Sequence, residues 1–292
     1  MTMRTDLTSP DIATALAWAR PLLDGAEARI LLRHVLDCSA ARLSAYPESR
    51  LDETEWEQFR HLVERRRVGE PIAYLTGERE FYGYPLMVTP TVLIPRHETE
   101  LLVELALAHF SASPRARVLD LGTGSGALAV ALAGELPEPD VTAVDRSREA
   151  LLVAMANAAR LKVSVSFVVS DWFSALAGDR FDLIVANPPY VASGDPHLVD
   201  GDVRFEPSGA LVSGPEGLDD IERIAQQAPY HLEVGGWLFI EHGYNQAARV
   251  RSLLTDAGFA AIASWQDLAG VERVSGGQWL VMGGVGNTSS SA

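Results

Sequence analysis

The chain has 292 residues, a length typical of about two domains, with 47% hydrophobic and 22% charged residues. These are ordinary values for globular proteins and exclude a disordered, collagen-like or disulfide-rich chain. The 24 lysines and arginines against 39 aspartates and glutamates leave a formal net charge of −15. This balance argues weakly against a protein that binds a phosphate backbone without regard to sequence.

A single cysteine, Cys38, excludes an internal disulfide and favours a reducing compartment, the cytoplasm. The first twenty residues lack the apolar core of a signal peptide, and no apolar stretch approaches the ~20 residues that span a bilayer. The seven histidines show no ligand spacing, so we expect no metal site. We therefore expect a cytoplasmic protein without a membrane partner.

Residues 10–70 carry apolar side chains at helical spacing and predict a small helical domain over residues 1–75. Thr54 and Glu57 are predicted to cap its last long helix. The run Arg65–Arg67 is interpreted as the solvated end of that helix, where cations complement the helix dipole.

Residues 76–97 are rich in proline, glycine and aromatic residues and are predicted to link two domains. Two short β-like pieces, Arg79–Tyr82 and Pro85–Val88, flank Gly83. The linker is therefore expected to contain a β-hairpin.

Residues 98–282 show strands alternating with helices, and residues 283–292 form a polar tail expected to be flexible. The expected strands are 117–121, 140–145, 163–169, 181–186, 235–243, 259–265 and 278–282, and the expected helices are 98–110, 126–136, 147–161, 217–232 and 246–258. Such alternation predicts an α/β fold, a mostly parallel sheet covered on both faces.

A glycine-rich loop follows the first of these strands and precedes a helix, the position of a nucleotide-binding turn. It consists of Asp120, Gly122, Thr123, Gly124, Ser125 and Gly126, with Leu121 between the first two. The spacing differs from that of a dehydrogenase, and the loop has no basic residue to hold a pyrophosphate. An acidic residue suits a ligand with an ammonium group, such as S-adenosylmethionine. The alternative is a plain strand–turn–helix junction.

Asp145 ends the next strand, and Asp171 and Trp172 follow the one after it. A carboxylate in the first position can accept hydrogen bonds from ribose hydroxyls. Asp171 can accept from an adenine amino group while Trp172 lines the ring. A helix cap and simple packing are the alternatives, but three sites at successive strand ends favour a cofactor crevice.

Asn187, Pro188, Pro189 and Tyr190 follow the apolar strand at 181–186. The proline after Asn187 holds that residue extended, and two prolines remove two backbone donors. The Asn187 side-chain oxygen and the Pro188 carbonyl would form two acceptors for a planar NH₂ group, on which Tyr190 could stack. We predict Asn187, Pro188 and Tyr190 as catalytic, all four residues as substrate-binding, and Asn187 also as near the methyl donor. A rigid turn is the alternative.

Over roughly residues 10–282 the chain resembles the protein-(glutamine N5) methyltransferases that modify class-I peptide chain release factors. The resemblance is carried by the linker run from Gly69 to Glu100, "VLDLGTGSGALAVALA", "AVDRS", "SDWFSAL", "IVANPPYV", "GDVRFEPSGALVSG" and "LFIEHG". It implies a Rossmann-like class I methyltransferase domain with S-adenosylmethionine bound by the glycine loop, Asp145 and Trp172. It also implies that Asn187–Tyr190 bind the glutamine of a Gly-Gly-Gln motif, and thus a role in translation termination.

Two features depart from the family pattern. His97 stands where the family linker usually has a second proline. The chain also contains its own Gly276-Gly277-Gln278, so methylation of Gln278 is a hypothesis, against which a predicted strand at that position argues. Arg204 and Glu206 either orient a loop over the site or form a structural salt bridge.

Two other functions stay open on the sequence. The same acceptor pair fits the exocyclic amine of adenine or guanine in a nucleic acid, although the net charge of −15 disfavours a direct nucleic-acid partner. A binding module without catalysis is the second alternative. We expect the helical domain to recognise the protein substrate; the oligomeric state is open, with a monomer favoured.

Overall fold

The computed structural model describes residues 9–280, in which the chain divides into two compact units. One unit contains the described residues up to Glu78 together with Val88–Pro90 and His197–Phe205. The other contains Arg79–Met87, Thr91–Pro196 and the described residues from Glu206 onward. The predicted flexible tail and the predicted strand end at 281–282 lie outside the described residues.

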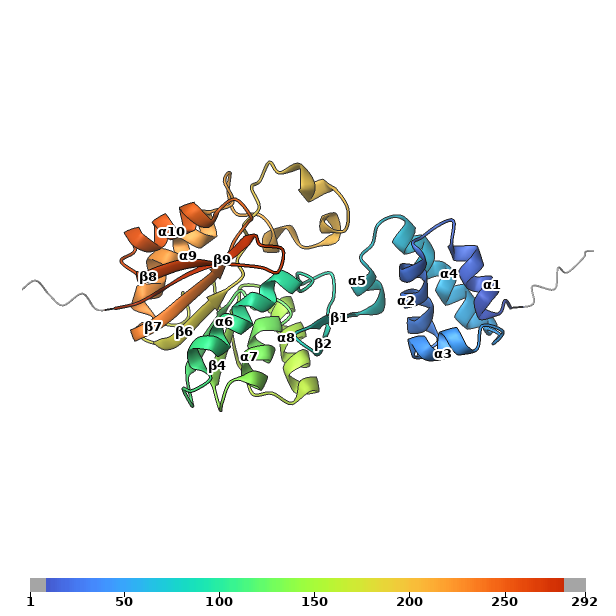
Figure 1. Cartoon of the computed structure of the whole chain (residues 1–292), viewed down its shortest axis with the longest axis horizontal. Coiled ribbons are helices and arrows are strands. Elements are labelled where there is room, and N and C mark those ends of the chain that lie inside the picture. The colour runs from blue at the N-terminus through green and yellow to red at the C-terminus, as the bar shows by residue number, and fades with distance from the viewer. Residues whose placement is uncertain (1–8, 281–292) are drawn as a thin grey trace, which may run out of the picture. The chain divides into compact units, whose positions relative to one another are not determined.

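The first unit is helical, as predicted (Figure 1). Its helices are α1 (Ile12–Ala19), α2 (Gly25–Val35), α3 (Ala40–Ala45), α4 (Glu53–Arg67) and α5 (Ile72–Thr76). Leu31, Leu32 and Phe59 are fully buried between them, and each such side chain contributes about 1.5–3 kcal/mol by leaving water. The predicted cap of α4 was wrong: Asp52 and Glu55 form a capping box, because each side chain accepts from the other's backbone N–H at 2.7 Å.

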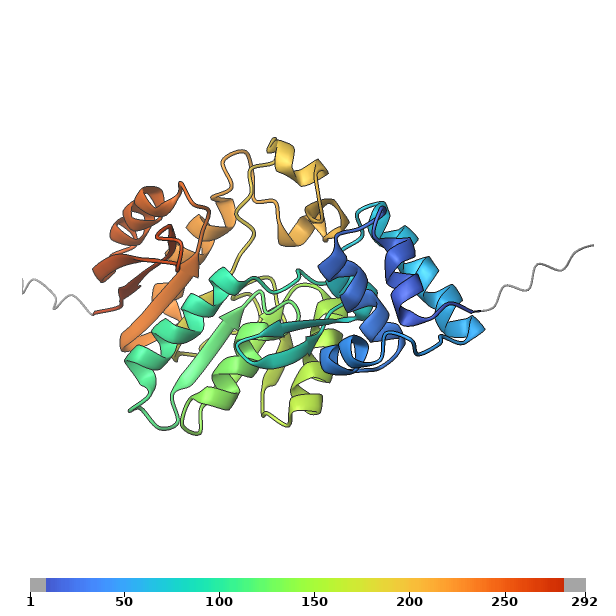
Figure 2. The same cartoon turned by 45° about the vertical axis from the view of Figure 1, so that its right-hand side comes forward.

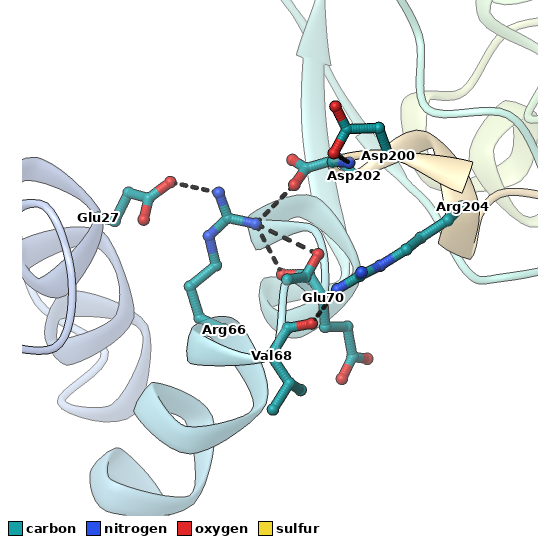
Figure 3. A network of polar contacts seen from close by, with 9 residues as sticks. Glu27, Arg66, Val68, Glu70, Asp200, Asp202 and Arg204 are labelled. Carbon is teal, nitrogen blue, oxygen red and sulfur yellow. Dashed lines mark hydrogen bonds and ion pairs between the residues drawn. The ribbon is translucent and has the colours of Figure 1, made fainter. Parts of the chain in front are cut away.

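The end of α4 binds a segment that is distant in sequence, so the interpretation of Arg65–Arg67 as a solvated helix end is wrong for Arg66 (Figure 3). The side chains of Arg65 and Arg67 are 40% and 53% exposed, as that interpretation expects. Arg66 donates to Glu27 of α2 at 2.6 Å and to Asp202 at 2.7 Å. Arg204 donates to the carbonyl of Val68. The stretch His197–Phe205 therefore packs within the helical unit although it follows the sixth strand in sequence.

The second unit contains a hairpin and an α/β layer structure. The hairpin pairs β1 (Glu78–Phe81), whose first residue is assigned to the helical unit, with β2 (Tyr84–Met87). Tyr82 and Gly83 both have positive φ angles, 51° and 80°, as a two-residue turn that matches the strand twist requires. The predicted hairpin is confirmed.

Among the described residues the larger sheet has seven strands in the order β5-β4-β3-β6-β7-β9-β8, with β9 antiparallel to its neighbours. The strands are β3 (Arg117–Leu121), β4 (Asp140–Asp145), β5 (Ser166–Val169), β6 (Phe181–Ala186), β7 (Leu232–Glu241), β8 (Ala260–Gln266) and β9 (Glu272–Gln278). Apolar residues alternate toward the two faces, where two separate cores form. The predicted mostly parallel sheet is confirmed.

Helices cover both faces of this sheet (Figures 1 and 2). One face carries α6 (Glu100–Phe110), α7 (Ala127–Glu135) and α8 (Arg148–Leu161), and the other carries α9 (Asp219–Gln227) and α10 (Ala247–Asp256). The predicted helix at 217–232 is shorter than expected because Pro229 lies in a 3₁₀ turn that ends α9. No described helix has the length and apolar character that crossing a bilayer requires.

The chain's own Gly-Gly-Gln is built into the sheet. A Cβ on Gly276 would lie 2.4 Å from the ring of Phe239, and one on Gly277 would lie 2.9 Å from Phe259. Gln278 ends β9 rather than beginning a strand, and its Nε2 donates to the Gly235 carbonyl at 2.9 Å. Close packing accounts for the two glycines, and the strand holds Gln278 in place.

Candidate active site

A pocket in the second unit lies beyond the carboxyl ends of β3, β4, β5 and β6. After β3 the chain adds β4 and β5 on one side of β3, and it then returns to add β6 on the opposite side. Open α/β sheets bind ligands at the point between β3 and β6 where the strand order reverses in this way. The pocket is lined by Thr91, Val92, Leu93, Gly122, Gly124, Asp145, Arg146, Ser147, Ala150, Ser170, Asp171, Trp172, Asn187, Pro189, Pro207, Gly209 and Ala210.

The glycine loop adopts a backbone that side chains disfavour. Gly122, Gly124 and Gly126 have φ angles of 73°, 56° and 84°. A Cβ on Gly126 would lie 3.0 Å from that of Ala154 on α8, so this glycine allows helix packing. Gly122 and Gly124 line the pocket, whereas Gly126 does not.

Asp120, Thr123 and Ser125 of the same loop do not line the pocket, and each is no more than 6% exposed. Asp120 Oδ2 accepts from the Thr123 hydroxyl at 2.6 Å and from the Ala129 N–H at 3.1 Å, while Oδ1 has no partner among the described residues. Burial raises the pKa of Asp120 to about 7, against the lowering effect of these hydrogen bonds. A buried carboxyl with one unpartnered oxygen is suited to a cationic ligand group.

Asp145, Asp171 and Trp172 all line the pocket, as predicted. Asp145 accepts from the N–H groups of Gly124 at 3.0 Å and Ser147 at 2.8 Å, and Ser147, not Asp145, caps α8. Asp171 is half exposed and pairs with Arg223 at 2.9 Å.

The indole ring of Trp172 lies against the loop, since a Cβ on Gly122 would be 3.2 Å from it. Its Nε1 donates to Asp220 at 3.1 Å, which fixes the ring plane. The ring is 8% exposed and forms a flat apolar wall beside the pocket.

Asn187 follows β6 and borders the pocket with one polar atom free. Its Nδ2 donates to the hydroxyl of Thr99 at 3.0 Å, whereas its Oδ1 is buried without a partner among the described residues. Leaving such an acceptor unpaired costs about 1–3 kcal/mol, and a ligand N–H would remove that cost.

Pro188, Pro189 and Tyr190 complete this turn, and of these only Pro189 lines the pocket. The Tyr190 hydroxyl donates to Glu241 Oε1 at 3.1 Å, and its carbonyl accepts from Gln246 at 3.0 Å. Burial raises the pKa of Tyr190, and the neighbouring Glu241 carboxylate raises it further. Tyr190 is thus held through its hydroxyl by Glu241 and through its main-chain carbonyl by Gln246, and its hydroxyl stays protonated.

Sequence reasoning assigned no role to three residues that line the pocket. Thr91, Val92 and Leu93 come from the linker, whose sequence was recognised only through a resemblance. Glu206 is 6% exposed, forms an ion pair with Arg96 and accepts from the N–H of Ile94 at 3.0 Å. The alternatives considered for Arg204 and Glu206 therefore separate: Glu206 forms a structural salt bridge with Arg96, whereas Arg204 donates to the carbonyl of Val68.

One group of described residues brings metal-binding side chains together: Glu80, His97 and Glu100. Glu80 accepts from the hairpin N–H of Gly83, and Glu100 accepts from His97 and from the N–H of Tyr82. These contacts account for the group as part of the hairpin turn, so it lends no support to a metal centre.

Known proteins match both parts of the chain. The family model described as the methyltransferase small domain matches residues 98–200, and the one described as the PrmC N-terminal domain matches residues 14–77. A crystal structure of a methyltransferase from Pyrococcus furiosus covers 77% of this chain and 98% of its own with a TM-score of 0.52 at 18% identity. A 16S rRNA N2 G1207 methyltransferase from T. thermophilus has the same TM-score at 23% identity, over 69% of this chain and 49% of its own. The chain therefore has the class I methyltransferase fold.

Relatives of higher identity narrow this class to one family. A release factor glutamine methyltransferase from Bordetella pertussis is 50% identical over 89% of this chain and 96% of its own length. One from Xylella fastidiosa (strain Temecula1) is 47% identical over 92% and 98%. The chain belongs to the release factor glutamine methyltransferase family.

Proposed function

We propose that this protein transfers a methyl group from S-adenosylmethionine to the side-chain amide nitrogen of the glutamine in the Gly-Gly-Gln motif of class-I release factors. The observation that carries the chemistry is the buried, unpartnered Oδ1 of Asn187 at the pocket. A side-chain NH₂ group has the donors that this atom lacks.

The residues at the strand ends fit S-adenosylmethionine. Asp145 lines the pocket and is placed for ribose hydroxyls, and Trp172 offers an apolar face there for the adenine ring. Asp120 does not line the pocket, but its buried Oδ1 has no partner among the described residues and would accept from an ammonium group that reached it. When bound, S-adenosylmethionine supplies a methyl group that is electrophilic because it is attached to a sulfonium sulfur.

Asn187 would hold the substrate amide nitrogen and favour the geometry in which the lone pair of that nitrogen is available for attack on the methyl group. An amide nitrogen is a weak nucleophile because its lone pair is delocalised into the carbonyl. An N–H bonded to Oδ1 aims that lone pair and stabilises the positive charge that develops on nitrogen. The Pro188 carbonyl was predicted as the second acceptor, but Pro188 does not line the pocket in this structure. Placing the nitrogen about 3–3.5 Å from its reaction partner provides further acceleration, and no strong base is needed.

The helical unit would recognise the release factor, since a tripeptide offers little surface for specificity. The match of residues 14–77 to the PrmC N-terminal domain supports this division. The net charge of −15 disfavours a direct nucleic-acid partner, and the single cysteine is consistent with action in the cytoplasm.

Methyl transfer from labelled S-adenosylmethionine tests the proposal. A purified release factor, its Gly-Gly-Gln glutamine-to-alanine variant and duplex DNA are compared, and the modified peptide is located by mass spectrometry. We expect label only in the intact factor, at that glutamine. Label in the alanine variant or in DNA would contradict the proposed substrate, and label at Gln278 would support methylation of this chain itself.

A further inference from the structure

Gln246 is a buried residue to which the methyl transfer described above gives no role. It directly precedes α10, is 8% exposed and does not line the pocket. Its side-chain amide hydrogen-bonds to main-chain groups on three separate segments of the chain. A buried amide with this many main-chain partners holds those segments together.

The side-chain NH₂ group of Gln246 donates to two of these segments. Its Nε2 lies 3.0 Å from the carbonyl oxygen of Tyr190, which ends the Asn187–Tyr190 turn. The same nitrogen lies 3.2 Å from the carbonyl oxygens of both Glu216 and Gly217, in the loop that leads into α9. One amide group therefore joins the turn to this loop.

The chemistry of these partners fixes which way the amide of Gln246 faces. A main-chain carbonyl can only accept, so Nε2 must face the turn and the loop. A main-chain N–H can only donate, and that of Gly243 donates to Oε1 at 2.8 Å. The turn and the loop are also in close contact, because a Cβ on Gly217 would lie 2.2 Å from the Tyr190 carbonyl oxygen.

The loop held by Gln246 leads to the residue that fixes the Trp172 ring. Asp220, in the first turn of α9, accepts from Trp172 Nε1 at 3.1 Å. The N–H of Asp220 donates to Ser213 Oγ at 2.8 Å, and the N–H of Ser213 donates to the carbonyl of Val191 at 3.0 Å. Gln246 thus lies between the segment proposed to hold the substrate and the segment that supports the proposed wall of the cofactor site.

We propose that Gln246 is a positioning residue that sets the Asn187–Tyr190 turn at the distance from the Trp172 wall that methyl transfer requires. The inference rests on the proposed function for the identity of the two reactants. A displacement of about 1 Å between reacting groups can lower a rate about 100-fold. Because Gln246 does not line the pocket, its loss should leave both reactants bound but poorly aligned.

Two variants of similar size test the proposal through turnover. Gln246→Met fills the space without polar atoms, and Gln246→Glu keeps an acceptor for Gly243 but as a carboxylate cannot donate to the three carbonyls. Both should lower kcat about 100-fold, while the KM for the release factor and the Kd for S-adenosylmethionine stay within about threefold. Asn245→Ala, which changes the exposed neighbouring amide, is the control and should turn over like the wild type.

A kcat close to that of the wild type in both Gln246 variants would overturn the proposal. A loss that appears only as a higher KM or Kd would overturn it too, because the residue would then support binding rather than alignment.

A double-mutant cycle shows whether Gln246 acts through the turn. Asn187→Ala removes the group that is positioned, so adding Gln246→Met to this variant should lower turnover by no more than about threefold. A further loss of about 100-fold would mean that the two residues act independently, and would contradict a positioning role.

Hydrogen–deuterium exchange tests the contact without turnover. The N–H groups of Val191 and Ser193 donate to the Leu211 and Gly214 carbonyls at 2.8 and 2.9 Å, so the segment after the turn should exchange slowly. In both Gln246 variants exchange should rise in peptides that span 190–193 and 211–217, but not in β3, whose protection reports that the sheet is folded.

Unchanged exchange at 190–193 in both variants would contradict the proposed positioning. Faster exchange in the variants, together with a wild-type protein that leaves the release factor unmethylated, would contradict only the proposed function.

Discussion

The helical unit and the active site each contain polar side chains that join distant segments, but they balance charge in opposite ways. In the helical unit one cation, Arg66, lies between two carboxylates, Glu27 and Asp202, in side chains that are 17–47% exposed (Figure 3). In the active site the Glu241 carboxyl is 1% exposed, pairs with no basic side chain of the described residues, and accepts one hydrogen bond, from the Tyr190 hydroxyl at 3.1 Å. The first arrangement joins two segments of the chain, whereas the second costs stability because burial disfavours the charged form of the carboxyl.

The largest expected effect comes from removing the side-chain amide of Asn187 in the active site. Asn187→Ala removes the acceptor that we assign to the substrate nitrogen, so kcat should fall about 100- to 1000-fold. Initial rates with a release factor measure this, and calorimetry should show S-adenosylmethionine binding still measurable. Turnover close to that of the wild type would rule out the acceptor role.

The second effect is the stability cost of the unpaired anion. The folded-state pKa of Glu241, about 7, lies above its ordinary value of 4.5, so the native state keeps a proton that the unfolded chain loses between these values. The free energy of unfolding therefore falls as pH rises through this window, by up to about 3 kcal/mol. Glu241→Gln should remove this part of the decrease in denaturant titrations at about pH 5.5 and about pH 8.

Asp120, with its pKa of about 7, produces a decrease of the same sign in the same window. Asp120→Asn is therefore the matched variant, and the double variant should have the smallest pH dependence. A pH slope unchanged in all three would show that neither carboxyl titrates as described.

A smaller effect comes from the helical unit. Hydrogen bonding to Glu27 and Asp202 raises the pKa of Arg66 above its already high value. Because both pairs are partly exposed, Arg66→Ala should lower stability by only about 1–2 kcal/mol, less at about 1 M salt. Arg66→Lys, which keeps the charge but loses the fork that reaches both carboxylates, should lie between. Thermal unfolding measures the series, and an unaltered loss in high salt would argue against charge pairing.

The smallest expected effect concerns the hydrogen bond between Tyr190 and Glu241 in the active site. Tyr190→Phe removes the hydroxyl that donates to Glu241 but leaves the hydrogen bond from Asn187 to Thr99 in place. We expect kcat to fall by less than about tenfold. A loss as large as that of Asn187→Ala would mean that the Tyr190 hydroxyl matters to the reaction as much as the Asn187 amide does.

The parts of the fold that depend on local pattern could be predicted from the sequence. Strand–helix alternation identified the sheet, and the glycine loop and the Asn187–Tyr190 turn were placed at its carboxyl edge because each directly follows a buried strand. Thr99 could not be placed beside Asn187, since the two are 88 residues apart and nothing in their local sequence shows which segments meet. Arg66 was misread for the same reason: its partner Asp202 lies 136 residues further on.

The discontinuity of the helical unit has a consequence for synthesis on the ribosome. N-terminal domains generally fold as soon as they have emerged. Here the stretch His197–Phe205, which supplies Asp202 and Arg204 to the end of α4, is translated only after β6. The nascent helices can form early, but Arg66 meets its second carboxylate only when two thirds of the chain has been made.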